Sequence, residues 1–302
     1  GKPISPDIDL ANIARRTPGF TGADLANVLN EAALLTARVN QTLITPEIID
    51  EAIDRVIAGP QKRTRVMNEH ERLITAYHEG GHALVAAAQP NSDPVHKITI
   101  MPRGRALGYT MVLPDQEKYS TTRNEMLDQL SYMLGGRAAE EMVFHDPTTG
   151  ASNDIEKATT VARAMVTQYG MTERLGAIRY GQEQNEVFLG RDMGHVRDYS
   201  EEIAAAIDEE VRALIEQAHQ EAYEILFDNR DILDRLVVEL LEKETLDKAQ
   251  VAAIFSDIRR RDARPAWTGS ARRRPHERGP VDVPSSNGNG AGAHVAYPDQ
   301  PV

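Results

Sequence analysis

The chain has 302 residues, of which 41% are hydrophobic, so it is long enough to bury a core and to form two domains. Its net charge of −12 argues against nucleic acid as the main partner, and the absence of cysteine excludes disulfides and thiolate metal ligands and fits a reducing compartment. No apolar run approaches the ~20 residues of a membrane helix, and no signal peptide is recognisable.

The first segment, residues 1–60, contains only helical patterns. Thr21 can cap a long helix, with Asp24 at N3 as its capping-box partner. Thr45-Pro46 places a capping residue before a proline at the first helical position, which opens a second, shorter helix. We therefore expect a small helical bundle here, followed by a basic linker over residues 61–67.

Residues 68–258 have the pattern of a second, mostly helical domain. Asn68 can cap a helix, with Glu71 as its capping-box partner, and Pro90 marks its end. Two strand-like segments follow within residues 95–113, and the turn between them indicates a β-hairpin. The helical patterns after the hairpin cover residues 121 to 144, 154 to 169, 199 to 228, 230 to 242 and 246 to 261.

Residues 259–302 differ in composition from the rest of the chain. An arginine-rich stretch leads into proline, glycine, serine and asparagine, and the clearest low-complexity run is Ser285 to Gly290. This composition predicts a basic and then low-complexity disordered tail. The arginines could contact anionic lipid or acidic protein, but a solvated tail is the interpretation we favour.

The segment His78-Glu79-Gly80-Gly81-His82 lies within the helix that Asn68 opens. Residues four apart on a helix point in the same direction, so the two histidines can bind one metal ion. Zinc proteases use this H-E-x-x-H spacing, with the histidines as zinc ligands and the glutamate as general base. The alternative is a helix with two incidental histidines. Each glycine costs about 1 kcal/mol in a helix, which indicates a close approach to this backbone, by another helix or by something else.

A catalytic zinc takes three protein ligands, so one more nitrogen or oxygen ligand is needed. One subclass places a third histidine six residues after the second, but Ala88 occupies that position. A carboxylate on a later helix remains, and the candidates are Glu140, Glu141 and Asp154. We favour Asp154, since a carboxylate in the first turn of a helix is kept ionised by the helix dipole; Ser152 or Asn153 would cap this helix. Asp154 could instead be an ordinary helix-start acid, and the two glutamates a solvated pair or partners that hold a histidine tautomer.

Several segments resemble known families. Thr17 to Leu25, Asn30 to Leu35 and Glu51 to Gly59 are similar to the small helical lid of an AAA ATPase. Four further segments resemble the FtsH family of membrane-anchored, ATP-dependent zinc proteases: His78 to His82, Leu134 to Glu141, Thr148 to Asp154 and Phe188 to Asp192. The likeness covers roughly residues 5–250 and leaves the tail outside. Most members of that family have alanine at the position of Gly80.

The resemblance implies that His78, His82 and Asp154 are zinc ligands and that Glu79 is the general base. It also implies a homo-hexameric ring, an N-terminal transmembrane anchor and a catalytic part that faces the cytoplasm. This chain has no phosphate-binding loop ending in Gly-Lys-Thr or Gly-Lys-Ser and no Walker B strand, so we expect ATP and magnesium to bind only in a full-length protein. Because the chain begins at Gly1 without an initiator methionine, we expect a soluble piece of that longer protein.

The expected fold is mostly α: a small helical AAA lid, then a helical zincin-type peptidase domain with a short hairpin. The expected function is zinc endopeptidase activity on unfolded or membrane proteins delivered by an ATPase. Alternatives are a non-catalytic ring-forming scaffold with a vestigial zinc site, and a free-standing zinc peptidase. We further expect substrate to add as a strand along the hairpin, and the apolar stripe within residues 199–241 to form either subunit contacts or core.

Overall fold

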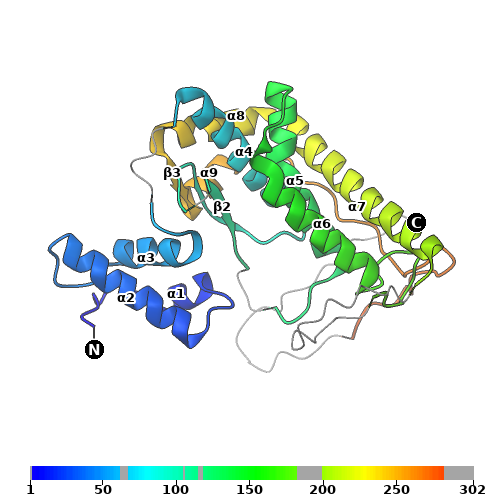
Figure 1. The fold of residues 1–302 in the computed structure, drawn as a ribbon, viewed down its shortest axis with the longest axis horizontal. Helices are drawn as coiled ribbons and strands as arrows, with labels where there is room; N and C mark the ends of the chain where they lie inside the picture. Colours follow the sequence, from blue (N-terminus) through cyan, green and yellow to red (C-terminus); the bar gives the residue numbers. More distant parts are fainter. Residues whose placement is uncertain (1, 62–66, 105, 115–117, 182–198, 282–302) are drawn as a thin grey trace, which may run out of the picture.

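The computed structural model describes residues 2–61, 67–104, 106–114, 118–181 and 199–281. Its helices form two groups: the smaller contains the first three helices, and the larger packs against a small sheet at its side (Figure 1). The expected fold class, mostly helical with a small sheet, is confirmed.

The smaller group comprises α1 (Leu10–Arg16), α2 (Gly22–Arg38) and α3 (Pro46–Ala58). Thr21 and Asp24 form both bonds of the capping box at the start of α2, as the sequence predicts. Pro46 does open α3, although Thr45 makes no side-chain capping bond. A core of its own holds this bundle together, formed by Val28, Ala32, Ile44, Ile49, Ala52 and Ile53.

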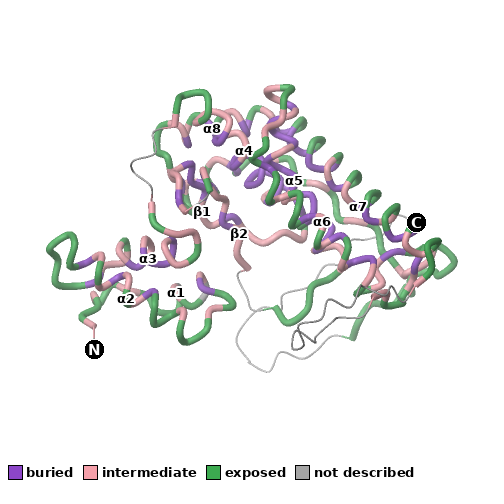
Figure 2. Tube along the Cα trace, viewed as in Figure 1, coloured by how far each residue is buried: buried purple, intermediate pink, exposed green. Residues whose placement is uncertain are grey.

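The helix α4 (Glu69–Ala88) carries the histidine motif through the middle of the larger group. Asn68 caps it by accepting a hydrogen bond from the Glu71 backbone N–H at 2.8 Å. The predicted capping box is wrong in its second half: the structure shows no return bond from the Glu71 side chain to the Asn68 backbone N–H. Buried residues dominate α4 from Glu79 onward (Figure 2).

The motif glycines allow α4 to pack closely against its neighbours. A Cβ added at Gly81 would lie 2.5 Å from the Gly135 carbonyl oxygen, on α5 (Arg123–Phe144). The backbones of α4 and α5 therefore nearly touch, which confirms the helix-packing interpretation of these glycines. A Cβ at Gly80 would meet the ends of two side chains, Leu233 at 3.1 Å and Leu236 at 3.3 Å, so an alanine there requires small shifts of both.

The sheet has the order β2-β1-β3, with β1 (Val95–Thr99) between β2 (Tyr109–Val112) and β3 (Thr245–Asp247), and both pairings are antiparallel. The predicted hairpin is confirmed. The predicted helix over residues 246–261 is wrong at both ends, since β3 occupies its start and α9 (Lys248–Ile254) is short. Leu246 is fully buried opposite Ile98, so packing against β1 holds this segment extended.

The other helices are α6 (Ser152–Thr167), α7 (Glu201–Asp228) and α8 (Arg230–Lys243), with a 3₁₀ turn, η1 (Thr149–Ala151), before α6. The apolar stripe of α7 packs inside the molecule, against α5 and α6. This stripe therefore belongs to the core. It supplies no evidence for subunit contacts.

The smaller bundle contacts the hairpin through charged side chains. Lys97 of β1 binds Asp54 at 2.8 Å, and Arg103 in the hairpin turn binds Glu51 at 2.6 Å. Asp54 is almost completely buried, with 3% of its surface exposed, and Arg103 also lies 3.5 Å from it, so two cationic side chains face this carboxylate. The proposed domain boundaries, 1–60, 61–67, 68–258 and 259–302, stay a prediction.

The start of the arginine-rich segment differs from a solvated tail. The Arg261 backbone N–H donates to the Ala88 carbonyl at the end of α4, and the Arg264 side chain, 13% exposed, lies between Asp128 and Glu221. The solvated-tail expectation is thus wrong for Arg264, because two buried carboxylates bind it. The Phe188 to Asp192 segment and the Ser285 to Gly290 run lie outside the described residues. None of the described helices combines the length and the apolar character that a bilayer crossing requires.

Candidate metal centre

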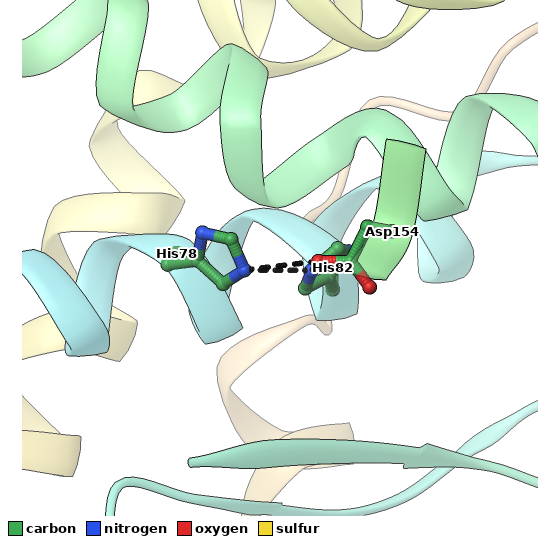
Figure 3. A group of neighbouring side chains, drawn as sticks. All are labelled: His78, His82 and Asp154. Carbon is green, nitrogen blue, oxygen red and sulfur yellow. Dashed lines mark hydrogen bonds and ion pairs between the residues drawn. The ribbon is translucent and has the colours of Figure 1, made fainter. Parts of the chain in front are cut away.

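His78, His82 and Asp154 converge from two helices (Figure 3). The histidines project from one face of α4, and their Nε2 atoms lie 3.1 Å apart. Asp154, in the first turn of α6, places its Oδ2 atom 3.4 Å from His78 Nε2 and 3.5 Å from His82 Nε2. The three ligand atoms lie within 4.8 Å of one another, which is the spacing that one bound ion requires.

The far side of each imidazole ring is fixed by a partner. His78 Nδ1 donates to Glu140 Oε1 at 2.7 Å, and His82 Nδ1 donates to the Tyr132 carbonyl at 2.8 Å. A carboxylate and a carbonyl only accept hydrogen bonds, so both rings carry their proton on Nδ1. The Nε2 atoms of the neutral rings therefore present lone pairs to the space beside Asp154.

This arrangement fits a zinc ion. Two nitrogen lone pairs and a carboxylate oxygen face one another, and in the neutral rings no proton lies between them. Three acceptors in contact repel one another unless a cation lies between them. Two imidazoles and one carboxylate are also a ligand set that catalytic zinc sites use.

A proton on Nε2 of an imidazole can also lie between the rings and Asp154, and the pKa shifts of His78 and Asp154 both favour a positive charge at that position. Burial acts to lower the pKa of His78, but hydrogen bonds to Asp154 and Glu140 outweigh it and raise this pKa to about 10. Burial acts to raise the pKa of Asp154, but hydrogen bonds from His78 and His82 hold it well below its usual range. The carboxylate thus stays ionised, as a metal ligand must.

The local backbone explains why Asp154 reaches the histidines. The η1 turn brings the chain to Ala151, and α6 starts at Ser152. The predicted side-chain cap is wrong, because Ala151 is the N-cap residue and no side chain caps α6. The first-turn position of Asp154 is confirmed.

Glu140 and Glu141 have different surroundings. Glu140 accepts from His78 and, through Oε2, from the Thr148 backbone N–H at 2.5 Å, while Glu141 faces Arg137 and His219. Burial acts to raise the pKa of Glu140, but the bonds from His78 and Thr148 lower it overall. Glu140 therefore has the geometry of a partner that holds a histidine tautomer, one of the alternatives that the sequence leaves open.

Glu79 lies beside the three residues and is 7% exposed. Burial raises its pKa. Its Oε2 accepts a hydrogen bond from Thr110 of β2 at 2.9 Å. No sequence pattern pointed to Thr110 as a partner of Glu79, since the contact joins residues that lie 31 positions apart.

Gly136 is a further residue that the sequence did not single out. A Cβ at this position would lie 2.6 Å from His78 Nε2 and 2.6 Å from His82 Nε2. Any larger residue would push the imidazoles aside. Its place in a Gly-Gly pair within an otherwise regular helix was the signal that could have identified it.

The site opens into a cleft of about 1110 Å³. One wall carries the histidines and Glu79 of α4, another carries Gly108 to Thr110 at β2, and Asp154 lies at a third. A cleft beside a candidate metal site and the edge strand of a sheet has room for an extended chain. Fold and site together define a metallopeptidase domain of the H-E-x-x-H type, joined to a small helical bundle.

Comparisons with known proteins identify the family. Residues 65–254 match the model of Peptidase family M41, and residues 7–51 match the AAA+ lid domain. The chain belongs to peptidase family M41, whose matching region covers more than half of it.

Three similar relatives each carry the name ATP-dependent zinc metalloprotease FtsH. The protein from Cutibacterium acnes is 65% identical over 95% of this chain and 40% of its own length. The proteins from Rhodococcus erythropolis and Mycobacterium tuberculosis are 55% and 53% identical over 94% of this chain, and 33% and 37% of their own lengths. The chain thus spans about two fifths or less of these relatives.

Proposed function

We propose that this chain is the peptidase part of an ATP-dependent zinc endopeptidase. His78, His82 and Asp154 would hold the zinc ion, and Glu79 would be the general base. The observation that carries the proposal is the convergence of two imidazole lone pairs and one ionised carboxylate. The names of the relatives support the choice of zinc.

The residues around the site suit peptide hydrolysis. A bound zinc supplies Lewis acidity, which polarises the scissile carbonyl and makes the attacking water more acidic. Glu79 takes the proton from that water and passes it to the leaving amine. Burial favours this role, because a raised pKa makes the carboxylate a stronger base and then a usable acid.

The substrate would be an unfolded polypeptide that adds to β2 as an extra strand. β2 is an edge strand, and its residues line the cleft beside Glu79. Hydrogen bonds between main chains provide affinity without reading side chains, which suits an enzyme that cuts many sequences. Membrane proteins become substrates by the same route once they are unfolded.

ATP would drive unfolding and delivery, through a nucleotide-binding module outside these residues. The AAA+ lid match and the printed names of the relatives support this part of the proposal. By the same family relationship, six copies would form a ring, anchored in the cell membrane with this part on the cytoplasmic side. Sedimentation of the zinc-loaded protein that shows only a monomer at high concentration would contradict a self-sufficient ring.

The test of the catalytic proposal is the isosteric substitution Glu79→Gln. Cleavage of a permanently unfolded protein should fall by about 100- to 10,000-fold, the range for loss of a general base, while zinc content stays at the wild-type value. An exposed glutamate on α6 gives the matched control, Glu156→Gln, which should change neither quantity. Full activity of Glu79→Gln, or loss of its zinc, would contradict the role of Glu79.

A further inference from the structure

The catalytic cleft brings the edge strand β2 against the α4 residue that would act as base. Thr110 of β2 pairs across the sheet with Ile98, which is fully buried, so this part of the strand is firmly packed. Thr110 also lines the cleft. It is therefore fixed by the sheet and adjacent to the chemistry.

Among the residues that the structure describes, Glu79 is the one partner of the Thr110 hydroxyl. It lies 2.9 Å from Glu79 Oε2 and 2.9 Å from the Glu79 backbone carbonyl. Both Glu79 atoms are acceptors, so the single hydroxyl proton of Thr110 is shared between the carboxylate and the backbone carbonyl of the same residue. Within the described part of the chain, Thr110 is the one hydrogen-bond donor that reaches the Glu79 carboxylate.

Gly108, the residue immediately before β2, also restricts Glu79. A Cβ at Gly108 would lie 2.9 Å from Glu79 Cγ and 3.0 Å from Glu79 Oε1, as well as 2.6 Å from the Thr99 carbonyl oxygen. The strand backbone therefore passes directly against the glutamate side chain. Thr110 holds one carboxylate oxygen, and the bare backbone of Gly108 limits the movement of the other.

We propose that Thr110 is a positioning residue for the general base, which holds the Glu79 carboxylate in the orientation that proton transfer requires. This inference rests on the proposed function. A carboxylate on a flexible side chain adopts several rotamers, and fixing one of them lowers the entropy that the reaction must supply. Because Thr110 belongs to the edge strand, the strand that would bind substrate also orients the base.

Three variants of Thr110 separate its hydroxyl from its shape. Thr110→Val keeps the branched side chain and removes the hydroxyl; Thr110→Ala removes both; Thr110→Ser keeps the hydroxyl. On a flexible peptide that needs no unfolding, kcat should fall roughly 10- to 100-fold for the first two, with KM within about twofold. Thr110→Ser should retain most of the wild-type kcat.

Two measurements exclude a merely structural effect. Zinc content should equal that of the wild type in all three variants, and a crystal structure of Thr110→Val should show Glu79 in another rotamer or in several. Thr160→Val is the matched control, since the Thr160 hydroxyl of α6 donates to the Glu156 carbonyl, away from the cleft. It should leave kcat unchanged.

Distinct outcomes overturn the inference and the proposed function. Wild-type kcat in both Thr110→Val and Thr110→Ala, an unmoved Glu79, or a loss in Thr110→Ser as large as in the other variants would overturn the positioning role alone. The proposed function would fail if the zinc-loaded wild type did not cleave the peptide, or if Glu79→Gln cleaved it equally well.

Discussion

Two buried polar clusters of this protein contain similar side chains but differ in how their charges are matched. At the candidate metal site, the neutral rings of His78 and His82 face Asp154 with acceptor atoms only. In the second cluster, the guanidinium of Arg264 lies between the carboxylates of Asp128 and Glu221. While its imidazoles are neutral, the first cluster contains no cation of its own, whereas the second contains the Arg264 guanidinium.

The second cluster is satisfied at every carboxylate oxygen. Asp128 accepts from Arg264 at one oxygen and from Asn91 at the other, each Asn91 contact being 3.0 Å. Glu221 accepts from Arg264 at both oxygens, and also from Ser131 and Gln217. A buried network with all its groups paired stabilises one arrangement of the chain, whereas a set of unpaired acceptors is a binding site. Four predictions test this distinction.

Arg264→Leu should give the largest effect, on stability. The substitution leaves two buried carboxylates without their cation. Removal of one partner of a buried ion pair lowers the free energy of unfolding by about 3–5 kcal/mol. Urea denaturation of the zinc-loaded protein measures this loss. Arg261→Leu is the matched control, because its ion pair with Glu224 is exposed and contributes at most about 1 kcal/mol. Equal losses in both variants would show that the buried cluster has no special role.

Asp154→Ala should abolish tight zinc binding. Removal of one of three ligands should weaken affinity by more than about 100-fold, or about 2.7 kcal/mol, measured by competition with a chelator. Glu156→Ala, two residues further along α6 and exposed, is the control and should bind zinc as the wild type does. Undiminished affinity in Asp154→Ala would remove this residue from the ligand set.

Glu140→Ala should weaken zinc binding without abolishing it. Loss of the partner that orients His78 should cost roughly 10- to 100-fold in affinity, the usual effect of such an outer partner. Its neighbour provides the control, since Glu141 faces Arg137 and His219 and Glu141→Ala should bind normally. A complete loss of binding in Glu140→Ala would indicate that this carboxylate is itself a ligand.

The smallest expected effect is a pH dependence of the stability that the Arg264–Glu221 ion pair contributes. Burial acts to raise the pKa of Glu221, but hydrogen bonds from Arg264 and Gln217 lower it overall. A depressed pKa contributes stability above the unfolded value of about 4.3, and this contribution is lost as pH falls through the folded value. The stability difference between wild type and Arg264→Leu, from urea denaturation in chelator, should therefore narrow as pH is lowered below about 4. A difference that is constant with pH would contradict the ion-pair account.

The sequence predicts the metal-site cluster much better than the second cluster. His78 and His82 are four residues apart on one capped helix, so local geometry alone brings them together, and Asp154 follows from its place in a first helical turn. Arg264 looks like part of a polar tail, because nothing nearby in the chain reveals the carboxylates that bind it across 136 and 43 positions.

Contacts between residues far apart in the chain also explain the other features that the sequence did not predict. β3 is three residues long, too short for a periodic pattern, and only its pairing with β1 makes it a strand. Thr110 and the Tyr132 carbonyl reach Glu79 and His82 through tertiary contacts. A backbone carbonyl carries no residue-specific signal, so no sequence pattern can point to it.

Anomalous diffraction at the zinc absorption edge, on crystals of the zinc-loaded protein, locates the metal ion directly. We expect one strong peak in contact with His78 Nε2, His82 Nε2 and a carboxylate oxygen of Asp154, with Glu79 close by but not coordinated. A peak coordinated by Glu140 or Glu141, or the absence of a peak between the two imidazoles, would contradict this expectation.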